Sequence, residues 1–204
     1  MKRILAIGPH PDDIELGCFG TMARYRNEGD DVHFLVLSKG EGGTGGTEDE
    51  NRTDEAEESA ALIKAQLFIE DLPDRFISEG PETISVIEKY LDKIKPDRVF
   101  IPTSTDTHQD HRSTFNACMV ACRTIKEIYA YETPSTSRNF TPNFFVDITD
   151  FIELKVKAVK IHSSQGGKGY MADRAVKGLA EYRAFDILLN DKYVEGFDII
   201  KVVM

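Results

Sequence analysis

Two clusters of imidazole and carboxylate side chains each follow a short apolar run of the sequence. The first cluster comes directly after residues 4–8 and the second follows residues 99–101, and both runs have the composition of buried strands. The clusters comprise His10, Asp12, Asp13, His108, Asp110 and His111. Because ligands bind beyond the carboxyl ends of the strands in open α/β sheets, the clusters are predicted to be the halves of one metal site.

Imidazole nitrogens and carboxylate oxygens suit a catalytic Zn²⁺, which typically takes three protein ligands and leaves one position for water. His10, Asp13 and His111 would supply such a set for Zn²⁺ or another divalent metal. Neighbouring side chains on a tight turn point in different directions, so Asp12 is left over. A free carboxylate beside a metal-bound water, whose pKa falls to about 7, is a natural general base.

Each of these residues also has an ordinary structural interpretation. Asp12 or Asp13 alone would serve as the N-cap of a following helix, one of the commonest local arrangements. His10, His108 and His111 would then lie on loops and solvated turns. The gathering of these residues at predicted strand ends favours the site over the separate structural roles.

Size and composition indicate one globular domain covering residues 1–204. Hydrophobic residues make up 41% of the chain, and no apolar run approaches the roughly 20 residues needed to span a bilayer. The basic opening is followed by only a very short apolar run, which suits a buried strand better than a signal peptide. A cytoplasmic protein without a membrane span is therefore expected.

The charge balance narrows the class of partner. A formal net charge of -10 argues against nucleic acid, because such proteins normally carry a basic stripe that neutralises phosphates. A small-molecule substrate is the expectation. The three cysteines, Cys18, Cys118 and Cys122, are expected to be reduced thiols, and the last two are interpreted as small core residues.

Strand and helix patterns alternate along the chain, which predicts a doubly wound, mostly parallel sheet flanked by helices, a Rossmann-like α/β fold. Beyond residues 4–8, strands are predicted at 32–37, 67–69, 98–102, 128–131 and, as a late edge strand, 198–203. Helices are predicted at 14–28, 51–63, 81–94, 113–125, 149–162 and 172–185. The glycine-rich residues 39–47 lack a phosphate-loop pattern and are predicted to form a mobile loop over the strand ends, with a plain surface connection as the alternative.

Together these motifs closely resemble those of the LmbE/PIG-L family of zinc-dependent N-acetylglucosaminyl deacetylases. The matching residues are the run 9–18 (Pro-His-Pro-Asp-Asp-Ile-Glu-Leu-Gly-Cys), Gly20, Thr21, Arg52, Glu55, His108, Asp110, His111, His162, Ser164 and Gln165. The resemblance extends from the first strand to about residue 165. It departs at Phe19, where the family commonly has a small residue, and in the short C-terminal part.

The resemblance adds roles to residues that the sequence alone leaves open. Arg52, at the start of its helix, suits either a ligand or a salt bridge to an acid such as Glu48 or Asp49, and the resemblance implies contact with a sugar. His162 is more typical of a structural histidine, and the resemblance places it on the substrate side. The resemblance also implies that Asp110 supports His108 and that the protein is a homo-oligomer.

These observations predict a zinc-dependent hydrolase that removes the N-acetyl group from an N-acetylglucosamine-type sugar or sugar conjugate. A metal-bound water would attack the amide with Asp12 as general base, while His108 either donates a hydrogen bond to the oxyanion or protonates the leaving amine. Asp110 as a fourth ligand is a weaker alternative. The rival functions are a metal-dependent amidase acting on another amide, such as a thiol-sugar conjugate, and a non-catalytic metal-binding module.

Overall fold

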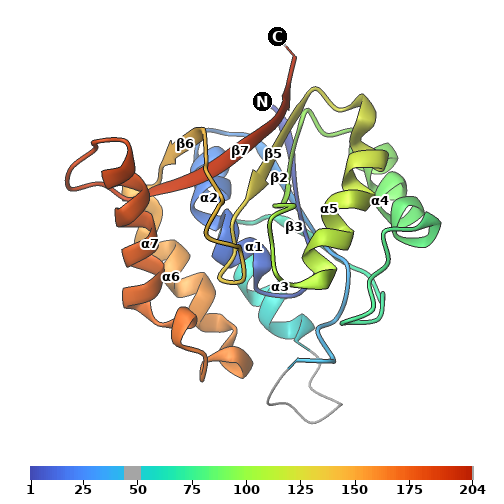
Figure 1. Cartoon of the computed structure of the whole chain (residues 1–204), viewed down its shortest axis with the longest axis horizontal. Coiled ribbons are helices and arrows are strands. Elements are labelled where there is room, and N and C mark those ends of the chain that lie inside the picture. The colour runs from blue at the N-terminus through green and yellow to red at the C-terminus, as the bar shows by residue number, and fades with distance from the viewer. Residues whose placement is uncertain (44–51, 204) are drawn as a thin grey trace.

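The computed structural model describes residues 1–43 and 52–203. Its seven-stranded sheet has the order β3-β2-β1-β4-β5-β7-β6 (Figure 1). The strands are β1 (Arg3–Gly8), β2 (Asp31–Val36), β3 (Gln66–Ile69), β4 (Arg98–Pro102), β5 (Glu127–Tyr131), β6 (Phe144–Asp147) and β7 (Val194–Val202). The first five strands pair in parallel, and β7 runs antiparallel to both β5 and β6.

Helices cover both faces of the sheet. They are α1 (Asp13–Gly17), α2 (Phe19–Asn27), α3 (Thr53–Ala61), α4 (Pro81–Ile94), α5 (Gln109–Ala121), α6 (Ile152–Ile161) and α7 (Asp173–Asp186). In Figure 1, α4 and α5 lie on one side of the sheet, and α6 and α7 lie on the other with α2 and α3. Single 3₁₀ turns span Cys122–Thr124, Thr149–Phe151, Ser163–Gln165 and Gly169–Met171.

Alternate residues of β1 explain why the sheet needs helices on both faces. Ile4 and Ala6 belong to the core beneath α2, α3, α6 and α7, whereas Leu5 and Ile7 belong to the core beneath α4 and α5. All four side chains are fully buried, as expected for a central parallel strand. The predicted α/β class, with a mostly parallel sheet flanked by helices, is confirmed.

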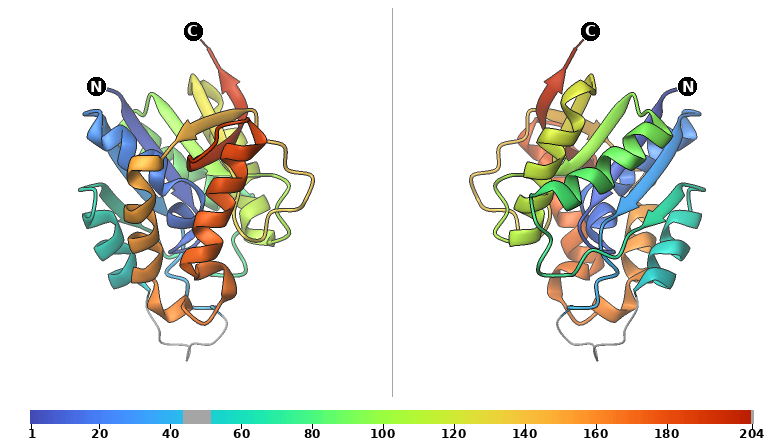
Figure 2. Two further views of the ribbon diagram at one scale, coloured as in Figure 1. Left: turned by 90° about the vertical axis from the view of Figure 1, so that its left-hand side faces the viewer. Right: turned by 90° about the vertical axis from the view of Figure 1, so that its right-hand side faces the viewer.

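The parallel strands deliver the two polar clusters to one edge of the sheet. Strands β1 and β4 are neighbours in register, with Ile4 opposite Arg98 and Ala6 opposite Phe100. The chain termini lie together at the end of the molecule where β1 begins (Figure 2). The residues that follow β1 and β4 therefore emerge side by side at the opposite end.

The predicted helix over residues 14–28 is broken into α1 and α2 at Cys18. Gly17 packs against the ring of Tyr131 so closely that no Cβ would fit there. The carbonyl oxygen of Leu16, which the break frees, accepts a hydrogen bond from Lys155 Nζ at 2.8 Å. Tertiary contacts thus override a helical sequence pattern at this point.

Two further differences concern strands and the second polar cluster. The predicted edge strand at 198–203 is in fact β7, which begins at Val194 and lies inside the sheet between β5 and β6. Strand β6, absent from the prediction, forms the edge. Helix α5 begins at Gln109 rather than near Ser113, so Asp110 and His111 lie in its first turn.

Two sequence predictions lie wholly or partly outside the described residues. Residues 44–47 of the predicted mobile loop lie outside the described residues, and so do Glu48 and Asp49, the suggested partners of Arg52. Among residues 1–43 and 52–203, no helix combines the length and the apolar character needed to cross a membrane.

Candidate active site

A cavity of about 330 Å³ opens where the polar clusters meet, and it is named here the polar cavity. Its walls come from the segments that follow β1, β2, β3, β4 and β5, the start of α3 and the turn before α7. The functional candidates that line it are His10, Asp12, Asp13, Arg52, His108 and His111.

A strained turn after β1 presents the first cluster. Asp12 has a φ of 119°, a conformation that L-residues with side chains rarely adopt, immediately before α1 begins at Asp13. The Asp13 carboxylate accepts a hydrogen bond from the backbone N–H of His10 at 2.9 Å, which holds the turn closed. The strain separates the two carboxylates, so that Asp12 and Asp13 face different partners.

His10, Asp13 and His111 converge at the base of the polar cavity. Asp13 Oδ2 lies 3.1 Å from His10 Nδ1, and Asp13 Oδ1 lies 3.3 Å from His111 Nε2. All three side chains are buried, and one donor atom from each lies within 4.8 Å of the others. Burial alone would raise the pKa of Asp13, but His111 and His10 outweigh it and hold that pKa well below its usual range.

Asp106, a residue missed by the sequence analysis, orients His111. Its Oδ2 lies 2.9 Å from His111 Nδ1, which leaves Nε2 directed at Asp13. Carboxylates on the outer nitrogen of this kind fix the tautomer of metal-ligating histidines. Burial would lower the pKa of His111, but Asp13 and Asp106 prevail and raise it to about 9.

His10 is surrounded by three carboxylates. Besides Asp13 on Nδ1, its Nε2 lies 3.0 Å from Asp110 and 3.1 Å from Asp74. These carboxylates raise the pKa of His10 well above its ordinary value even though burial opposes them. His10, His108 and Asp110 form a second candidate ligand group that shares His10 with the first.

Arg52 pairs with the remaining aspartate of the turn. Its guanidinium lies 2.8 Å from Asp12 Oδ1 and also donates to the carbonyl oxygen of Pro11. Burial raises the pKa of Asp12, an effect that Arg52 opposes and Asp13 reinforces, and the net direction is upward. Asp12 is thus a buried carboxylate shifted toward the range in which a base works near neutral pH.

His108 stands at the N-cap of α5, where its Nδ1 accepts the backbone N–H of Asp110 at 3.2 Å. An accepting Nδ1 means that the proton of the neutral ring is on Nε2. Burial, together with the neighbouring His10 and His111, lowers the pKa of His108. Its neutral ring is therefore a hydrogen-bond donor at the wall of the polar cavity.

Comparison with known proteins places this site in a family. The model of the family described as PIG-L, GlcNAc-PI de-N-acetylase, matches residues 5–122. The chain belongs to this PIG-L family. An "uncharacterized deacetylase YaiS" of Escherichia coli strain K12 is 36% identical over 171 residues, covering 80% of this chain and 91% of that protein.

Two further relatives of known name are deacetylases. The diacetylchitobiose deacetylase of Thermococcus kodakarensis is 30% identical, covering 81% of this chain and 70% of its own. The crystal structure of the N,N'-diacetylchitobiose deacetylase from Pyrococcus horikoshii is 28% identical with a TM-score of 0.82, covering 98% of this chain and 84% of its own. This PIG-L protein is accordingly an enzyme that acts on an amide bond.

The structure places Asp110 differently from the role that the resemblance implied. Its fully buried carboxylate lies against His10 Nε2 and accepts the backbone N–H of Arg75 at 2.7 Å. The hydrogen bond to the His108 ring comes from the Asp110 backbone N–H, while the carboxylate acts on that ring through its charge, which opposes the lowering of the His108 pKa. The carboxylate of Asp110 therefore contacts His10 directly rather than His108.

His162 lies behind the polar cavity and does not line it. The side chain is fully buried, with Nε2 at 3.5 Å from Glu15 and Nδ1 at 3.8 Å from Glu55. Burial would lower the pKa of His162, but Glu15 and Asp12 raise it. In this structure the neighbours of the His162 ring are the carboxylates of Glu15 and Glu55. Contact between His162 and the substrate stays a prediction.

Phe19, the departure from the family pattern, does not narrow the polar cavity. Its ring is fully buried in the core beneath α2, where its centroid lies 6.2 Å from that of Phe34 in an edge-on arrangement. The larger side chain at this position thus adds apolar packing on the side of the turn away from the polar cavity.

Three residues of the site escaped the sequence analysis. Asp74 and Tyr170 line the polar cavity, and Asp106 stands behind it. Asp106 carried a usable signal, since it follows β4 by four residues in the same loop as His108. Asp74 and Tyr170 lie in connections without a pattern of their own, and only the folded chain brings them to the site.

Proposed function

We propose that this PIG-L enzyme is a metal-dependent N-deacetylase that releases acetate from an N-acetylglucosamine-type sugar or sugar conjugate. The observation that carries the proposal is the convergence of His10, Asp13 and His111 in a cavity that also holds a separate carboxylate, Asp12. That combination provides one set of groups to hold an ion and another group to move a proton.

The donor set suits a divalent cation. Two imidazoles and one carboxylate are a common ligand combination for catalytic zinc, and Asp106 orients His111 Nε2 toward the other two ligands. The three carboxylates around His10 leave an excess of buried negative charge that a divalent cation would neutralise. His10, Asp13 and His111 would hold the ion, with Zn²⁺ as the first choice.

When bound, such an ion lowers the pKa of a coordinated water to about 7 and polarises the amide carbonyl. Asp12 takes the proton from the attacking water. The water oxygen forms a bond to the carbonyl carbon, the C–N bond breaks, and the leaving nitrogen receives the proton that Asp12 took, so that the products are acetic acid, which ionises to acetate, and a free amine. Arg52 keeps the Asp12 carboxylate in place through the 2.8 Å ion pair, and we assign it a second role in contacting the sugar, because it lines the polar cavity.

His108 supplies a hydrogen bond to the carbonyl oxygen as negative charge develops there. The hydrogen bond from Asp110 N to Nδ1 fixes the proton on Nε2, and the lowered pKa keeps the ring neutral. Of the two roles that the sequence left open, oxyanion donor is the one these contacts favour. Asp110 positions His10 in the same scheme.

The substrate class rests on the relatives. Two deacetylases named for diacetylchitobiose, at 30% and 28% identity, support an N-acetylated amino sugar as the substrate. The polar lining of the cavity, with Arg52, Arg75 and Lys168 among its side chains, suits hydroxyl-rich groups.

A reconstitution experiment tests the proposal. Metal-stripped protein should gain activity on addition of Zn²⁺, measured as acetate release from N-acetylglucosamine, diacetylchitobiose, N-acetylated sugar nucleotides and sugar conjugates. The Asp12→Asn protein, loaded with the same ion, is the matched control for contaminating hydrolases. Equal acetate release by the wild type and this control, with every substrate, would overturn the proposal.

A further inference from the structure

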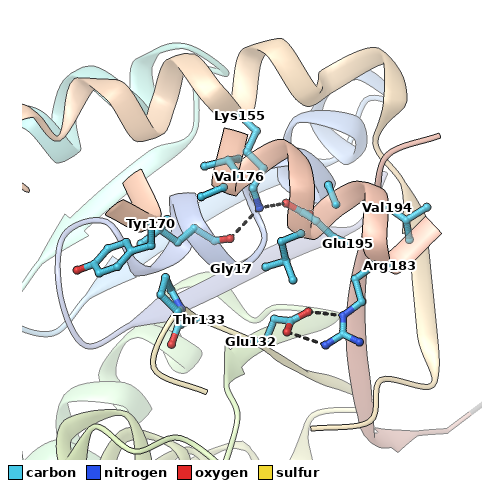
Figure 3. Close-up of a pocket in the computed structure, with 15 residues that line it drawn as sticks. Gly17, Glu132, Thr133, Lys155, Tyr170, Val176, Arg183, Val194 and Glu195 are labelled. Atoms are coloured by element: carbon cyan, nitrogen blue, oxygen red, sulfur yellow. Dashed lines mark hydrogen bonds and ion pairs between the residues drawn. The ribbon is translucent and has the colours of Figure 1, made fainter. Parts of the chain in front are cut away.

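A second cavity of about 260 Å³ lies beside the polar cavity, between α7, β7 and the residues that follow β5. We name it the apolar cavity. Figure 3 shows Tyr170 and Thr133 at one end of it and Val194 at the other, with Val176 on the wall formed by α7. None of these side chains has a part in the mechanism described above.

The two cavities are contiguous. Leu16, Thr133, Pro134 and Tyr170 line both of them. A molecule whose reacting amide lies over His10, Asp13 and His111 can therefore extend past Tyr170 without leaving the protein. The apolar cavity is smaller than the roughly 300–1,000 Å³ of pockets that bury a whole drug-sized ligand, so it suits one substituent of a larger molecule.

The charged side chains of the apolar cavity are already satisfied by one another. Lys155 lies 2.5 Å from Glu195, whose other contacts are the backbone N–H groups of Gly20 and Thr21. Arg183 forms two hydrogen bonds to Glu132, at 2.6 and 2.7 Å. Figure 3 shows these pairs on opposite walls.

Most of the surface that remains free for a ligand is apolar. The side chains between the two ion pairs are Leu16, Ala175, Val176, Leu179, Ala180 and Val194. Between the two ion pairs a polar substituent would lose hydration for few partners, since the Thr133 and Tyr170 side chains stand at one end of the cavity, whereas an alkyl or aryl group would gain by leaving water. Leu179 is 38% exposed, an apolar side chain with part of its surface still in water.

We propose that the apolar cavity is a subsite for an apolar substituent of the substrate, an alkyl or aryl group attached to the N-acylated sugar. The inference rests on the proposed function for the reacting amide, and it adds that simple N-acetyl sugars fill only part of the site. The apolar substituent is either part of the group joined to the sugar by the glycosidic bond or part of the acyl group joined through the amide.

Calorimetric titration distinguishes the sources. One arm measures the Kd of methyl, butyl and hexyl glucosides, which lack an amide, with the metal-loaded wild type. The other measures N-acetyl-, N-butanoyl- and N-hexanoylglucosamine with the metal-loaded Asp12→Asn variant. Each buried methylene strengthens binding by as much as about fourfold, so at least about a tenfold gain from the shortest to the longest ligand is expected in one arm. No gain in either arm overturns the proposal.

Two variants test whether the gain in affinity with chain length arises in the apolar cavity. Ala175→Leu adds bulk inside the apolar cavity at a half-buried position, and Leu179→Asn makes the wall polar at a partly exposed one. Each should reduce the gain to about twofold or less. Gly178→Val adds the same three carbons to α7 where nothing lies within 4 Å, and it should keep the full gain. A gain that survives both cavity variants would mean that the chains bind elsewhere.

These titrations measure binding without turnover, so they separate the subsite from the proposed reaction. Chain-length-dependent Kd values that are lost in Ala175→Leu, in a protein that releases no acetate, would support the subsite and overturn the proposed function. Acetate release together with Kd values that do not depend on chain length would support the proposed function and overturn the subsite.

Discussion

Charged side chains line both cavities, but they are arranged in opposite ways. In the apolar cavity, Lys155 faces Glu195, and Arg183 faces Glu132, with Asp186 also within 3.6 Å of its guanidinium. In the polar cavity, one imidazole, His10, lies within about 3 Å of carboxylates from three different segments of the chain. The first arrangement is balanced by the protein itself, and the second calls for a cation from outside.

This difference separates charges that stabilise the fold from charges that serve the reaction. Glu195 and Lys155 satisfy the backbone groups freed where α1 ends and α2 begins, so they are part of the structure that supports the turn after β1. The carboxylates of the polar cavity contact histidines or an arginine and no lysine. Substitutions in the two cavities should therefore have different consequences.

Loss of a metal ligand should have the largest effect. His111→Ala removes one of three proposed ligands, and metal affinity should fall by more than the 10–100-fold typical of outer-shell partners. Activity should fall with it. Equilibrium dialysis against a competing chelator, with metal content measured in each variant, is the test. His108→Ala is the control, because full metal retention in His111→Ala together with loss in His108→Ala would move the site to His10, His108 and Asp110.

Breaking a balanced pair should affect stability instead. Lys155→Met leaves Glu195 buried without its cation, since the two side chains are only 6% and 4% exposed. The free energy of unfolding should fall by about 3–5 kcal/mol. Urea denaturation measures it, and the double variant Lys155→Met/Glu195→Gln should recover part of the loss. A cost below about 1 kcal/mol would contradict the structural role assigned to this pair.

Removal of the general base should reduce turnover while leaving the ion in place. Asp12→Asn keeps the shape of the side chain but cannot accept the proton, so kcat should fall by about 100-fold or more. Metal content should match that of the wild type, because Asp12 faces Arg52 rather than the ligand group. If the ion were lost instead, the roles of Asp12 and Asp13 would have to be exchanged.

The neighbourhood of His10, Asp13 and His111 follows from local sequence patterns. Parallel strands that end at one edge bring their following residues together, and β1 and β4 are recognisable from their apolar runs. The contacts that escaped prediction depend on long-range packing. Gly17 and Gly20 are only a weak local signal of the helix break at Cys18. The partners that fix the break, Lys155 and Glu195, lie far along the chain. Strand β6 is short and pairs only with β7, so its formation depends on a strand that follows it by nearly fifty residues.

Arg52 connects substrate binding to proton transfer, and its substitution tests which role matters more. Arg52→Ala removes the cation that opposes the raised pKa of Asp12, so the acid limb of the pH–rate profile should move to higher pH and kcat/KM should fall about tenfold. Arg52→Lys should restore part of both. If Arg52→Ala raises KM but does not move the acid limb, Arg52 contacts the sugar and does not tune the pKa of Asp12. If kcat/KM is unchanged, Arg52 has neither role.

Metal uptake by the polar cavity should also depend on pH. The pKa of His111 is raised to about 9 in the metal-free protein, so at neutral pH a proton must leave before Nε2 can bind an ion. Metal affinity should rise about tenfold per pH unit for each proton released, from pH 7 until about pH 9. The stability of the metal-free protein should change in the opposite direction. A histidine whose pKa is raised on folding stabilises fully below its unfolded pKa of about 6.5, and that stabilisation is lost as the pH rises through 9. Isothermal titration with Zn²⁺ in buffers of different ionisation enthalpy counts the protons released. Release of no proton at pH 7 would show that His111 is neutral in the metal-free protein, which would contradict its raised pKa.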